Sequence, residues 1–280
     1  MIDMHIHTVH SDGEYTVKEI LKKCSDTNIS VMSITDHNDL EGSKELLEIK
    51  NYPNIRKISG IELSATAPKG TEKHILGYNF DVNNKELNEV TRCIREENIK
   101  KIASLLELLK THYKISFPDY EIEKLFSKVG NIGRPHIGQL MVKYGFSKSV
   151  HLAFEDYFKP LSDLTYKQKI KLTAKECIEY IKKAGGIVCH AHPITLNMDL
   201  DELEEYFKEL ISYGLDAIEV YHSSHSYEYM RQLEVLANKL NLYVSVGSDF
   251  HGPTIKPKIS LGTGIDNNLN HEYASILQIL

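Results

Sequence analysis

The chain has 280 residues, of which 41% are hydrophobic and 26% are charged, a composition typical of a globular protein that is large enough to bury a core. Its 33 basic and 39 acidic residues give a net charge of -6, which argues against stable binding of duplex nucleic acid through a basic surface. No apolar run approaches the roughly 20 residues of a membrane helix, and no signal peptide is recognisable. We therefore expect a cytoplasmic protein without membrane contact. The four cysteines are scattered, which predicts reduced thiols.

The first third of the chain alternates strand and helix patterns. Short apolar segments predict strands at 1–6, 31–35, 55–63 and 73–80. Helices are expected between the first three of them, over 16–27 and about 40–50. The first of these helices opens with a capping box from Thr16 to Glu19.

Residues 81 to about 169 break this alternation. Apolar residues from Leu87 to Leu109 recur at helical spacing and predict a long amphipathic helix. Another helix is expected over 137–144. We interpret 81–169 as a helical insertion that contributes to substrate binding, and we assign 1–80 together with 170–280 to one metal-binding domain.

The alternation resumes in the last third of the chain. The pattern predicts helices at 173–184, 200–213 and 226–240, alternating with strands at 186–192, 217–221 and 242–249. About seven strands alternating with helices predict an α/β fold with mainly parallel pairing. Periodicity does not decide whether the sheet closes into a barrel or stays open.

Histidine and carboxylate side chains recur close to the predicted strands, mostly where a strand ends. In parallel α/β proteins the carboxyl ends of the strands converge on one face, so residues far apart in sequence can meet there. A single H-x-H motif is often only structural, and the recurrence at several strands is what favours a metal site. The candidate ligands are His5, His7, Asp12, His37, Glu62, His74, His192, Asp249 and His251.

These candidate ligands are imidazoles and carboxylates, which suit Zn, Fe and Mn. His5 and His7 alternate along a strand, so they lie on the same face and can share an ion. Six histidines and three carboxylates exceed the ligand set of one metal. We expect two or three divalent metal ions.

Several other residues can contribute to the site. Arg134 precedes Pro135, which fits the first turn of a helix, and an arginine there suits phosphate binding, although a surface cap is the plainer interpretation. Whether His190, His136 and His222 reach the site is open at this point.

Eight motifs in order give the chain a resemblance to a known family: DMHIHTVHSDG, ITDHND, GIELSA, HILGY, GRPH, GGIVCHAHP, GLDAIEVYHSSHS and GSDFHG. Together they resemble the PHP (polymerase and histidinol phosphatase) family, over nearly the whole chain. The resemblance implies a distorted (β/α)7 barrel with a trinuclear Mn, Fe or Zn centre. Asn38 stands where this family often has aspartate, and no proline opens the helix at Thr16, but neither departure touches a ligand.

The resemblance also implies how the ligands are shared among three metals. His5, His7 and Asp249 would hold the first, and Asp12, His37 and His251 the second. His74 and His192 would hold the third, with Glu62 bridging it to the first. All nine positions are filled in this sequence.

GRPH and EVYHSSHS most resemble a small stand-alone branch of the family that hydrolyses phosphate esters of nucleotides. This implies that Arg134 and His225 bind substrate phosphate. We expect a metal-dependent phosphatase that hydrolyses a small phosphate monoester, either a nucleoside 3′,5′-bisphosphate or a short 5′-phosphorylated oligonucleotide, by attack of a metal-bridging hydroxide. The alternatives are a phosphatase of the histidinol-phosphate type, an amidohydrolase acting on C–N bonds, and a metal-binding domain without catalysis. The sequence does not set the oligomeric state, the exact substrate, the physiological metal or the group that protonates the leaving oxygen.

Overall fold

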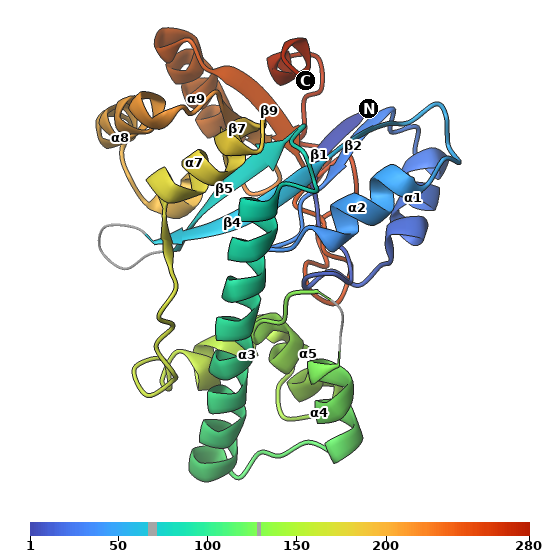
Figure 1. Ribbon diagram of the computed structural model, residues 1–280, viewed down its shortest axis with the longest axis vertical. Helices are drawn as coiled ribbons and strands as arrows, with labels where there is room; N and C mark the ends of the chain where they lie inside the picture. The colour runs from blue at the N-terminus through green and yellow to red at the C-terminus, as the bar shows by residue number, and fades with distance from the viewer. Residues whose placement is uncertain (67–71, 128–129) are drawn as a thin grey trace.

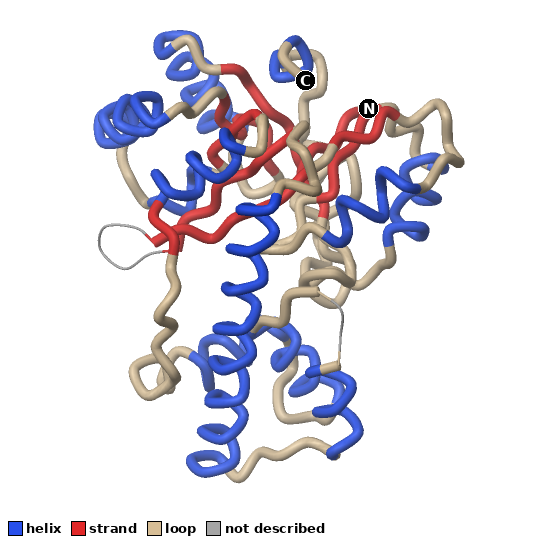
Figure 2. Tube along the Cα trace, in the orientation of Figure 1, coloured by secondary structure: helices blue, strands red, loops and turns tan. Residues whose placement is uncertain are grey.

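The computed structural model describes residues 1–66, 72–127 and 130–280, and for Glu72 only its backbone. Its strands gather in an upper body, and a lobe built from helices lies below them (Figures 1 and 2). A three-stranded parallel sheet has the order β1 (Ile2–Ile6), β2 (Val31–Ile34), β3 (Arg56–Ile58). A six-stranded sheet has the order β6 (Leu172–Thr173), β4 (Gly60–Thr66), β5 (Glu72–Tyr78), β7 (Ile187–His190), β8 (Ala217–His222), β9 (Tyr243–Gly247).

The fold is α/β with a mostly parallel arrangement of strands, and β5 is the exception. It runs antiparallel to both of its neighbours, β4 and β7. The expectation of parallel pairing is wrong here, because only residues 67–71 separate β4 from β5, too few for the crossover that parallel neighbours require. β7, β8 and β9 are parallel to one another, as expected.

The two sheets are joined by isolated backbone bridges at both sides. Ile6 pairs with Phe250, which follows β9, and His37, which follows β2, pairs with Glu62 of β4. Both bridges are parallel. Closure of the strands into a distorted seven-stranded barrel stays a prediction.

The single strand expected over 55–63 is two strands in the structure. Ser59 separates β3, which pairs with β2, from β4, which pairs with β5. At this junction the Ser59 hydroxyl donates to the carbonyl of Phe80 at 2.9 Å, and the amide of Asn79 donates to the carbonyl of Ser59 at 3.0 Å. The chain therefore changes sheet at Ser59, and Glu62 becomes the third residue of a new strand.

Helices surround the strands and form the lower lobe (Figure 1). Those of the upper body are α1 (Val17–Asp26), α2 (Glu41–Glu48), α7 (Ala174–Lys183), α8 (Leu200–Tyr213) and α9 (Tyr227–Leu240), with short 3-10 turns η3 (Pro193–Leu196) and η4 (Ser275–Gln278). The lobe holds α4 (Asp119–Phe126), α5 (Arg134–Lys143), α6 (Val150–Ala153) and the π-helical turn η2 (Phe154–Phe158). The capping box expected at Thr16 is present, and Thr173 forms another at the start of α7.

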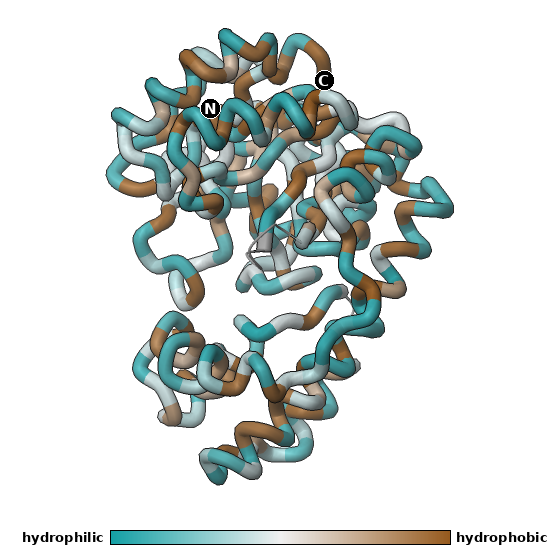
Figure 3. The backbone as a smooth tube through the Cα atoms, turned by 90° about the vertical axis from the view of Figure 1, so that its left-hand side faces the viewer, coloured by the Kyte–Doolittle hydropathy of each residue, from teal (hydrophilic) through white to brown (hydrophobic). Residues whose placement is uncertain are grey.

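One long helix, α3 (Lys85–Tyr113), joins the two parts of the molecule. Its first half places Leu87 and Ile94 in the core shared by the large sheet and its helices. Its second half places Ile102 and Leu105 in a separate core with helices of the lobe. Hydrophobic positions accordingly occur in both parts (Figure 3). The boundary between metal-binding domain and insertion stays a prediction, since α3 packs into both.

Among the described residues, no helix is both long enough and apolar enough to cross a membrane. All four cysteines are free thiols, and three of them are buried.

Candidate metal centre and cleft

The strands bring most of the predicted ligands to one place. His5 lies in β1 and His7 follows it, while Asp249 follows β9. The amide of Asp249 donates to the carbonyl of His5 at 2.8 Å, so the ends of β1 and β9 are aligned. His37 follows β2 and His192 follows β7. Each of these residues therefore lies at the carboxyl end of a strand, as predicted.

His74 reaches the same place by a different route. It is the third residue of β5, and it pairs in register with Ser64 near the carboxyl end of β4. Because β5 is antiparallel, its beginning lies beside the carboxyl ends of β4 and β7. The position of His74 near the start of its strand is thereby explained.

The first group of donors surrounds Nε2 of His5 and Nε2 of His7, which lie 3.1 Å apart. Oδ1 of Asp249 lies 3.6 Å from the first and 3.4 Å from the second. Oε2 of Glu62 lies 3.4 and 3.2 Å from the same two nitrogens. Ligand atoms that are each about 2.1 Å from one ion lie roughly 3–3.5 Å from one another, so these four atoms have the spacing of one metal site.

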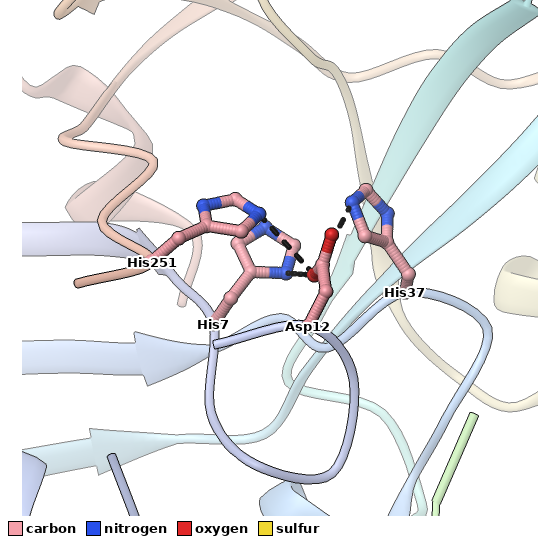
Figure 4. A group of neighbouring side chains, drawn as sticks. All are labelled: His7, Asp12, His37 and His251. Carbon is pink, nitrogen blue, oxygen red and sulfur yellow. Dashed lines mark ion pairs between the residues drawn. The ribbon is translucent and has the colours of Figure 1, made fainter. Parts of the chain in front are cut away.

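A second group gathers around the carboxylate of Asp12 (Figure 4). Its Oδ1 lies 3.3 Å from Nε2 of His251, 3.8 Å from Nδ1 of His7 and 3.9 Å from Nε2 of His37. One atom of each of these four residues lies within 4.8 Å of the others. The structure thus brings together the expected set of Asp12, His37 and His251, with the second ring nitrogen of His7 added to it.

Glu62 connects the first group to a third. Its Oε1 lies 2.9 Å from Nδ1 of His74 and 3.0 Å from Nε2 of His192, and those two nitrogens are 3.3 Å apart. The other oxygen of the same carboxylate faces the first group. This is the arrangement that the bridging position of Glu62 requires.

Three of the donor atoms lie in the shared space without a hydrogen-bond partner. Oδ1 of Asp12, Nδ1 of His37 and Oε2 of Glu62 are buried and make no hydrogen bond. The last two are only 2.9 Å apart, so their angles and not their distance prevent the bond. Buried polar atoms without a partner are costly, and a cation among them would satisfy all three. The donor set therefore fits divalent metals.

Burial and charge act against each other in this cluster. Burial disfavours ionised carboxylates, but the histidines around Glu62 outweigh it and hold the pKa of Glu62 well below its ordinary value. Burial likewise opposes protonation of His37, yet Glu62 and Asp12 raise the pKa of His37 to about 9. Burial lowers the pKa of His251 to about 4. Ionised carboxylates facing imidazoles form an electrostatic environment that favours cations.

The three histidines left open by the sequence have different positions. His222 reaches the site, with Nε2 at 3.3 Å from Oδ2 of Asp249. His136 supports a ligand loop, since its Nε2 donates to the carbonyl of Ser11 at 2.7 Å. His190 is buried on the other face of the sheet, where its ring packs against Phe207 of α8.

A cleft of about 550 Å³ lies between the ligand groups and the lobe. Asp12, His37, His74 and Arg134 are among the residues that line it. Arg134 begins α5, and its guanidinium carbon lies 5.2 Å from the centre of the Phe154 ring.

His225 does not line this cleft. It is 3% exposed, behind His222, and its Nδ1 donates to the carbonyl of Val220 at 2.8 Å. Burial lowers the pKa of His225 to about 3, so the ring is neutral. Direct contact of His225 with a substrate phosphate stays a prediction.

The model of the PHP domain family matches residues 3–223 of the chain. The chain belongs to the PHP family. The resemblance carried by its motifs is thereby confirmed, and the nine candidate ligands of this PHP protein lie in the three groups described above.

Relatives of this PHP protein match it over most of its length. A 5′-3′ exoribonuclease from Haemophilus influenzae is 27% identical over 268 residues, which are 94% of each chain. A 3′,5′-nucleoside bisphosphate phosphatase from Chromobacterium violaceum is 26% identical over 252 residues, covering 90% of this chain and 87% of that protein. A solved structure from Bifidobacterium adolescentis, described as that of a proposed metal-dependent phosphoesterase, has a TM-score of 0.85 at 26% identity and covers 100% of this chain and 95% of its own.

Two buried carboxylates of this PHP protein are not among the predicted site residues. Glu219 of β8 accepts from Nδ1 of His5 at 2.9 Å and from the amide of His192 at 2.8 Å. Asp36 accepts from the amide of Thr8 at 2.8 Å and the hydroxyl of Ser11 at 2.6 Å, and so fixes the loop before Asp12. A sequence signal for Glu219 exists, because it is a lone carboxylate within the apolar strand AIEVY, where an unpaired charge is rare.

Proposed function

We propose that this PHP protein is a metal-dependent phosphatase that hydrolyses small phosphate monoesters. The proposed substrates are a nucleoside 3′,5′-bisphosphate or a short 5′-phosphorylated oligonucleotide. The observation that carries the proposal is the carboxylate of Glu62, whose two oxygens face two separate groups of imidazole nitrogens. A carboxylate shared in this way holds two ions side by side, the arrangement used for in-line displacement at phosphorus.

The ligand assignment follows the three groups. His5, His7, Glu62 and Asp249 would hold one ion. Asp12, His37 and His251 would hold a second, and Glu62, His74 and His192 a third. Imidazole and carboxylate donors suit Mn, Fe or Zn. The bridges between the two sheets support a distorted (β/α)7 barrel around this centre.

The cleft supports a phosphate ester as the substrate. Arg134 lines the same cleft as Asp12, His37 and His74, and its guanidinium is a planar group whose paired donors match two phosphate oxygens. Relatives named as a nucleoside bisphosphate phosphatase and an exoribonuclease support a nucleotide as the rest of the substrate.

The protein side chains have separate roles in the proposed reaction. When bound, the divalent ions supply a water of lowered pKa and neutralise charge on the phosphoryl group. Arg134 binds and orients that group, and it offsets the charge that gathers on the oxygens during transfer. The carboxylates Asp12, Glu62 and Asp249 stay ionised at neutral pH because the surrounding charges, which are histidines at Asp12 and Glu62 and first of all Lys256 at Asp249, outweigh the effect of burial on their pKa.

Phosphate release tests this proposal. Manganese-loaded protein should release phosphate from adenosine 3′,5′-bisphosphate, and His37→Ala should reduce the rate by at least about 100-fold, the typical scale for loss of a metal ligand or its support. His112→Ala, at the exposed end of α3, is the matched control and should keep the wild-type rate.

Histidinol phosphate and a set of amides distinguish the alternatives. Faster hydrolysis of histidinol phosphate than of the bisphosphate would favour the histidinol-phosphate type. Amide hydrolysis without phosphate release would contradict the phosphatase assignment and favour C–N bond chemistry.

A further inference from the structure

A row of amide side chains runs along the wall of the cleft and ends at a candidate metal ligand. Nδ2 of Asn131 donates to the backbone carbonyl of His37 at 3.0 Å, and Nδ2 of Asn98 donates to Oδ1 of Asn131 at 2.8 Å. Nε2 of Gln168 donates to Oδ1 of Asn98 at 2.6 Å. Nζ of Lys101 donates to Oε1 of Gln168 at 3.4 Å. We call Asn131, Asn98 and Gln168 the amide row.

Both ends of the amide row fix its direction. A backbone carbonyl can only accept, so Asn131 must turn its NH₂ toward His37 and its oxygen toward Asn98. A lysine ammonium can only donate, so Gln168 must turn its oxygen toward Lys101 and its NH₂ toward Asn98. Asn98 therefore has one allowed orientation. Aligned bonds of this kind polarise and strengthen one another.

The amide row connects the lobe to the metal centre. Asn98 lies on α3, Gln168 lies between η2 and β6, and Asn131 lies just before α5. Asn131 is 5% exposed, and its backbone amide also donates to the carbonyl of His10 at 2.7 Å. Asn131 thus contacts the backbone of two of the loops that carry the second ligand group, those containing Asp12 and His37.

His37 needs such a restraint on the cleft side. Its side chain is 22% exposed, more than the 9% of Asp12 and the 2% of His251 in the same group. On the side of β4 its loop is held by the amide of Asn38, which donates to the carbonyl of Glu62 at 2.8 Å. On the cleft side, the bond from Asn131 holds the other face of the same loop.

We infer that Asn98 and Asn131 are positioning residues of the metal centre, through which the lobe holds His37 in place as a ligand. The inference rests on the proposed function in taking His37 as a metal ligand. It assigns the lobe a second task besides binding substrate, because the row ties the geometry of the second ligand group to the packing of α3. Residues that orient metal ligands typically change metal affinity by 10–100-fold when they are replaced.

Replacement of Asn98 by aspartate distinguishes lost positioning from added charge, because the two effects change the metal affinity in opposite directions. The carboxylate has no donor for Oδ1 of Asn131. Asn131 must then either face an oxygen or turn its own oxygen toward the carbonyl of His37, and both outcomes weaken the hold on the ligand. A new negative charge beside the centre would by itself attract cations and tighten metal binding. A fall in affinity therefore reports lost positioning and not added charge.

The test is a titration of metal-stripped full-length protein with Mn²⁺, in which the free ion is followed by electron paramagnetic resonance. We expect Asn98→Asp and Asn131→Asp to raise the Kd of at least one Mn²⁺ site about 10–100-fold. Gln168→Glu should raise it less, and it serves as the informative variant if the other two fail to fold. Asn83→Asp is the matched control. It makes the same change of charge at an exposed position and should leave the Kd unchanged.

A second readout separates positioning from direct substrate contact. At a Mn²⁺ concentration that does not saturate the sites, the kcat for a small aryl phosphate should be lower in Asn98→Asp than in the wild type, in line with its lower metal affinity. An increased KM for the nucleotide alone, with wild-type Mn²⁺ affinity, would overturn the inference and make Asn98 a substrate contact. If the wild type binds Mn²⁺ but hydrolyses no phosphate ester, the proposed function fails, while the affinities of the variants still decide the role of the amide row. Absence of Mn²⁺ binding by the wild type would overturn both.

Discussion

At the scale of single residues, the candidate centre depends on a carboxylate that would bind no metal itself. Glu219 is fully buried and accepts two hydrogen bonds, one from the ring of the candidate ligand His5 and one from the backbone of the candidate ligand His192. Because Glu219 accepts a hydrogen bond from Nδ1 of His5, the other ring nitrogen, Nε2, is the one that faces the first ligand group. It also fixes the backbone of His192, which has the unusual φ of 25°.

Glu219→Gln should weaken metal binding. A glutamine has one accepting oxygen, so it can serve His5 or His192 but turns a donor toward the other. We expect the affinity for Mn²⁺ to fall about 10–100-fold, measured by titration of metal-stripped protein. Glu209→Gln, at an exposed position on α8, is the control. Unchanged affinity in Glu219→Gln would show that the two hydrogen bonds do not set the ligand geometry.

Much of the ligand set could be predicted at this scale, because a ligand that follows a strand is visible as a polar residue after an apolar run. His37, His192 and Asp249 are of this kind. Glu219 could not be assigned a role in the same way, since it lies within a strand and its partners are distant in sequence. The hydrogen bond from Asn131 to His37 involves a backbone carbonyl, which carries no mark in the sequence.

At the scale of elements, the contacts of α3 with the segment before β6 decide how the cleft wall is held. Glu97 of α3 is 3% exposed and accepts from Nζ of Lys100 at 2.7 Å, from the amide of Lys169 at 2.6 Å and from the hydroxyl of Tyr166 at 3.1 Å. These hydrogen bonds, with that of Lys100 the largest, lower the pKa of Glu97 to about 2. The ionised form is therefore the one that joins the two segments.

Glu97→Gln should lower stability in a pH-dependent manner. Because the pKa of Glu97 is lower in the folded protein than its ordinary value of 4.5, its contribution is present above that value and is lost as pH falls toward about 2. Thermal unfolding should show the largest difference in Tm between wild type and variant near neutral pH, with the difference narrowing in acid. Glu107→Gln, exposed on the same helix, should show little difference. A difference in Tm between wild type and Glu97→Gln that stays constant with pH would contradict the role of the ionised carboxylate.

Most helices and strands were predictable because each has its own periodicity or capping signal. The two-residue strand β6 was not predicted, and two further errors among the strands concern pairing and not local pattern. Ser59 and Gly60 interrupt the apolar pattern only briefly, and the pairing of the two halves with different sheets reveals the break. The reversal of β5 follows from the short connection between β4 and β5. That short spacing is visible in the sequence, but the alternation of strands and helices elsewhere in the chain led to the expectation of parallel pairing.

At the scale of the whole molecule, α3 is a rigid connection between two cores. Its 29 residues span about 43 Å at 1.5 Å per residue. The core of the lobe contains Leu105, which is 1% exposed and clusters with Ile137 and Met141. The core of the upper body contains Leu233 of α9, which is fully buried. Each core can therefore be weakened separately.

Leu105→Ala should loosen the lobe and spare the sheet. Loss of a buried leucine costs about 2–5 kcal/mol, and sub-global opening follows the cores. In hydrogen exchange, we expect faster exchange across α5 and residues 150–158 and little change in β8 and β9. Leu233→Ala should give the reverse pattern. Equal acceleration in both parts for each variant would show that the molecule opens as one unit.

The class of fold was predictable because alternation of strands and helices restricts the arrangement to few topologies. The position of the lobe relative to the ligand groups was not, because it depends on contacts such as those of Asn131 and His136 with loop backbones. Such contacts join segments more than 90 residues apart and follow no local pattern.

The pairing of β5 with β7 places Tyr78 directly opposite Ile187. The chain from 79 to 171 leaves the sheet after β5, and the chain then re-enters the sheet through β6 beside β4 and through β7 beside β5. Closing a longer loop between fixed ends adds little entropic cost, so residues can be added to or removed from this excursion without shifting the register of the strands that carry the ligands. Evolution can in this sense reshape the parts of the lobe beyond the amide row while the strands that carry the candidate ligands keep their register.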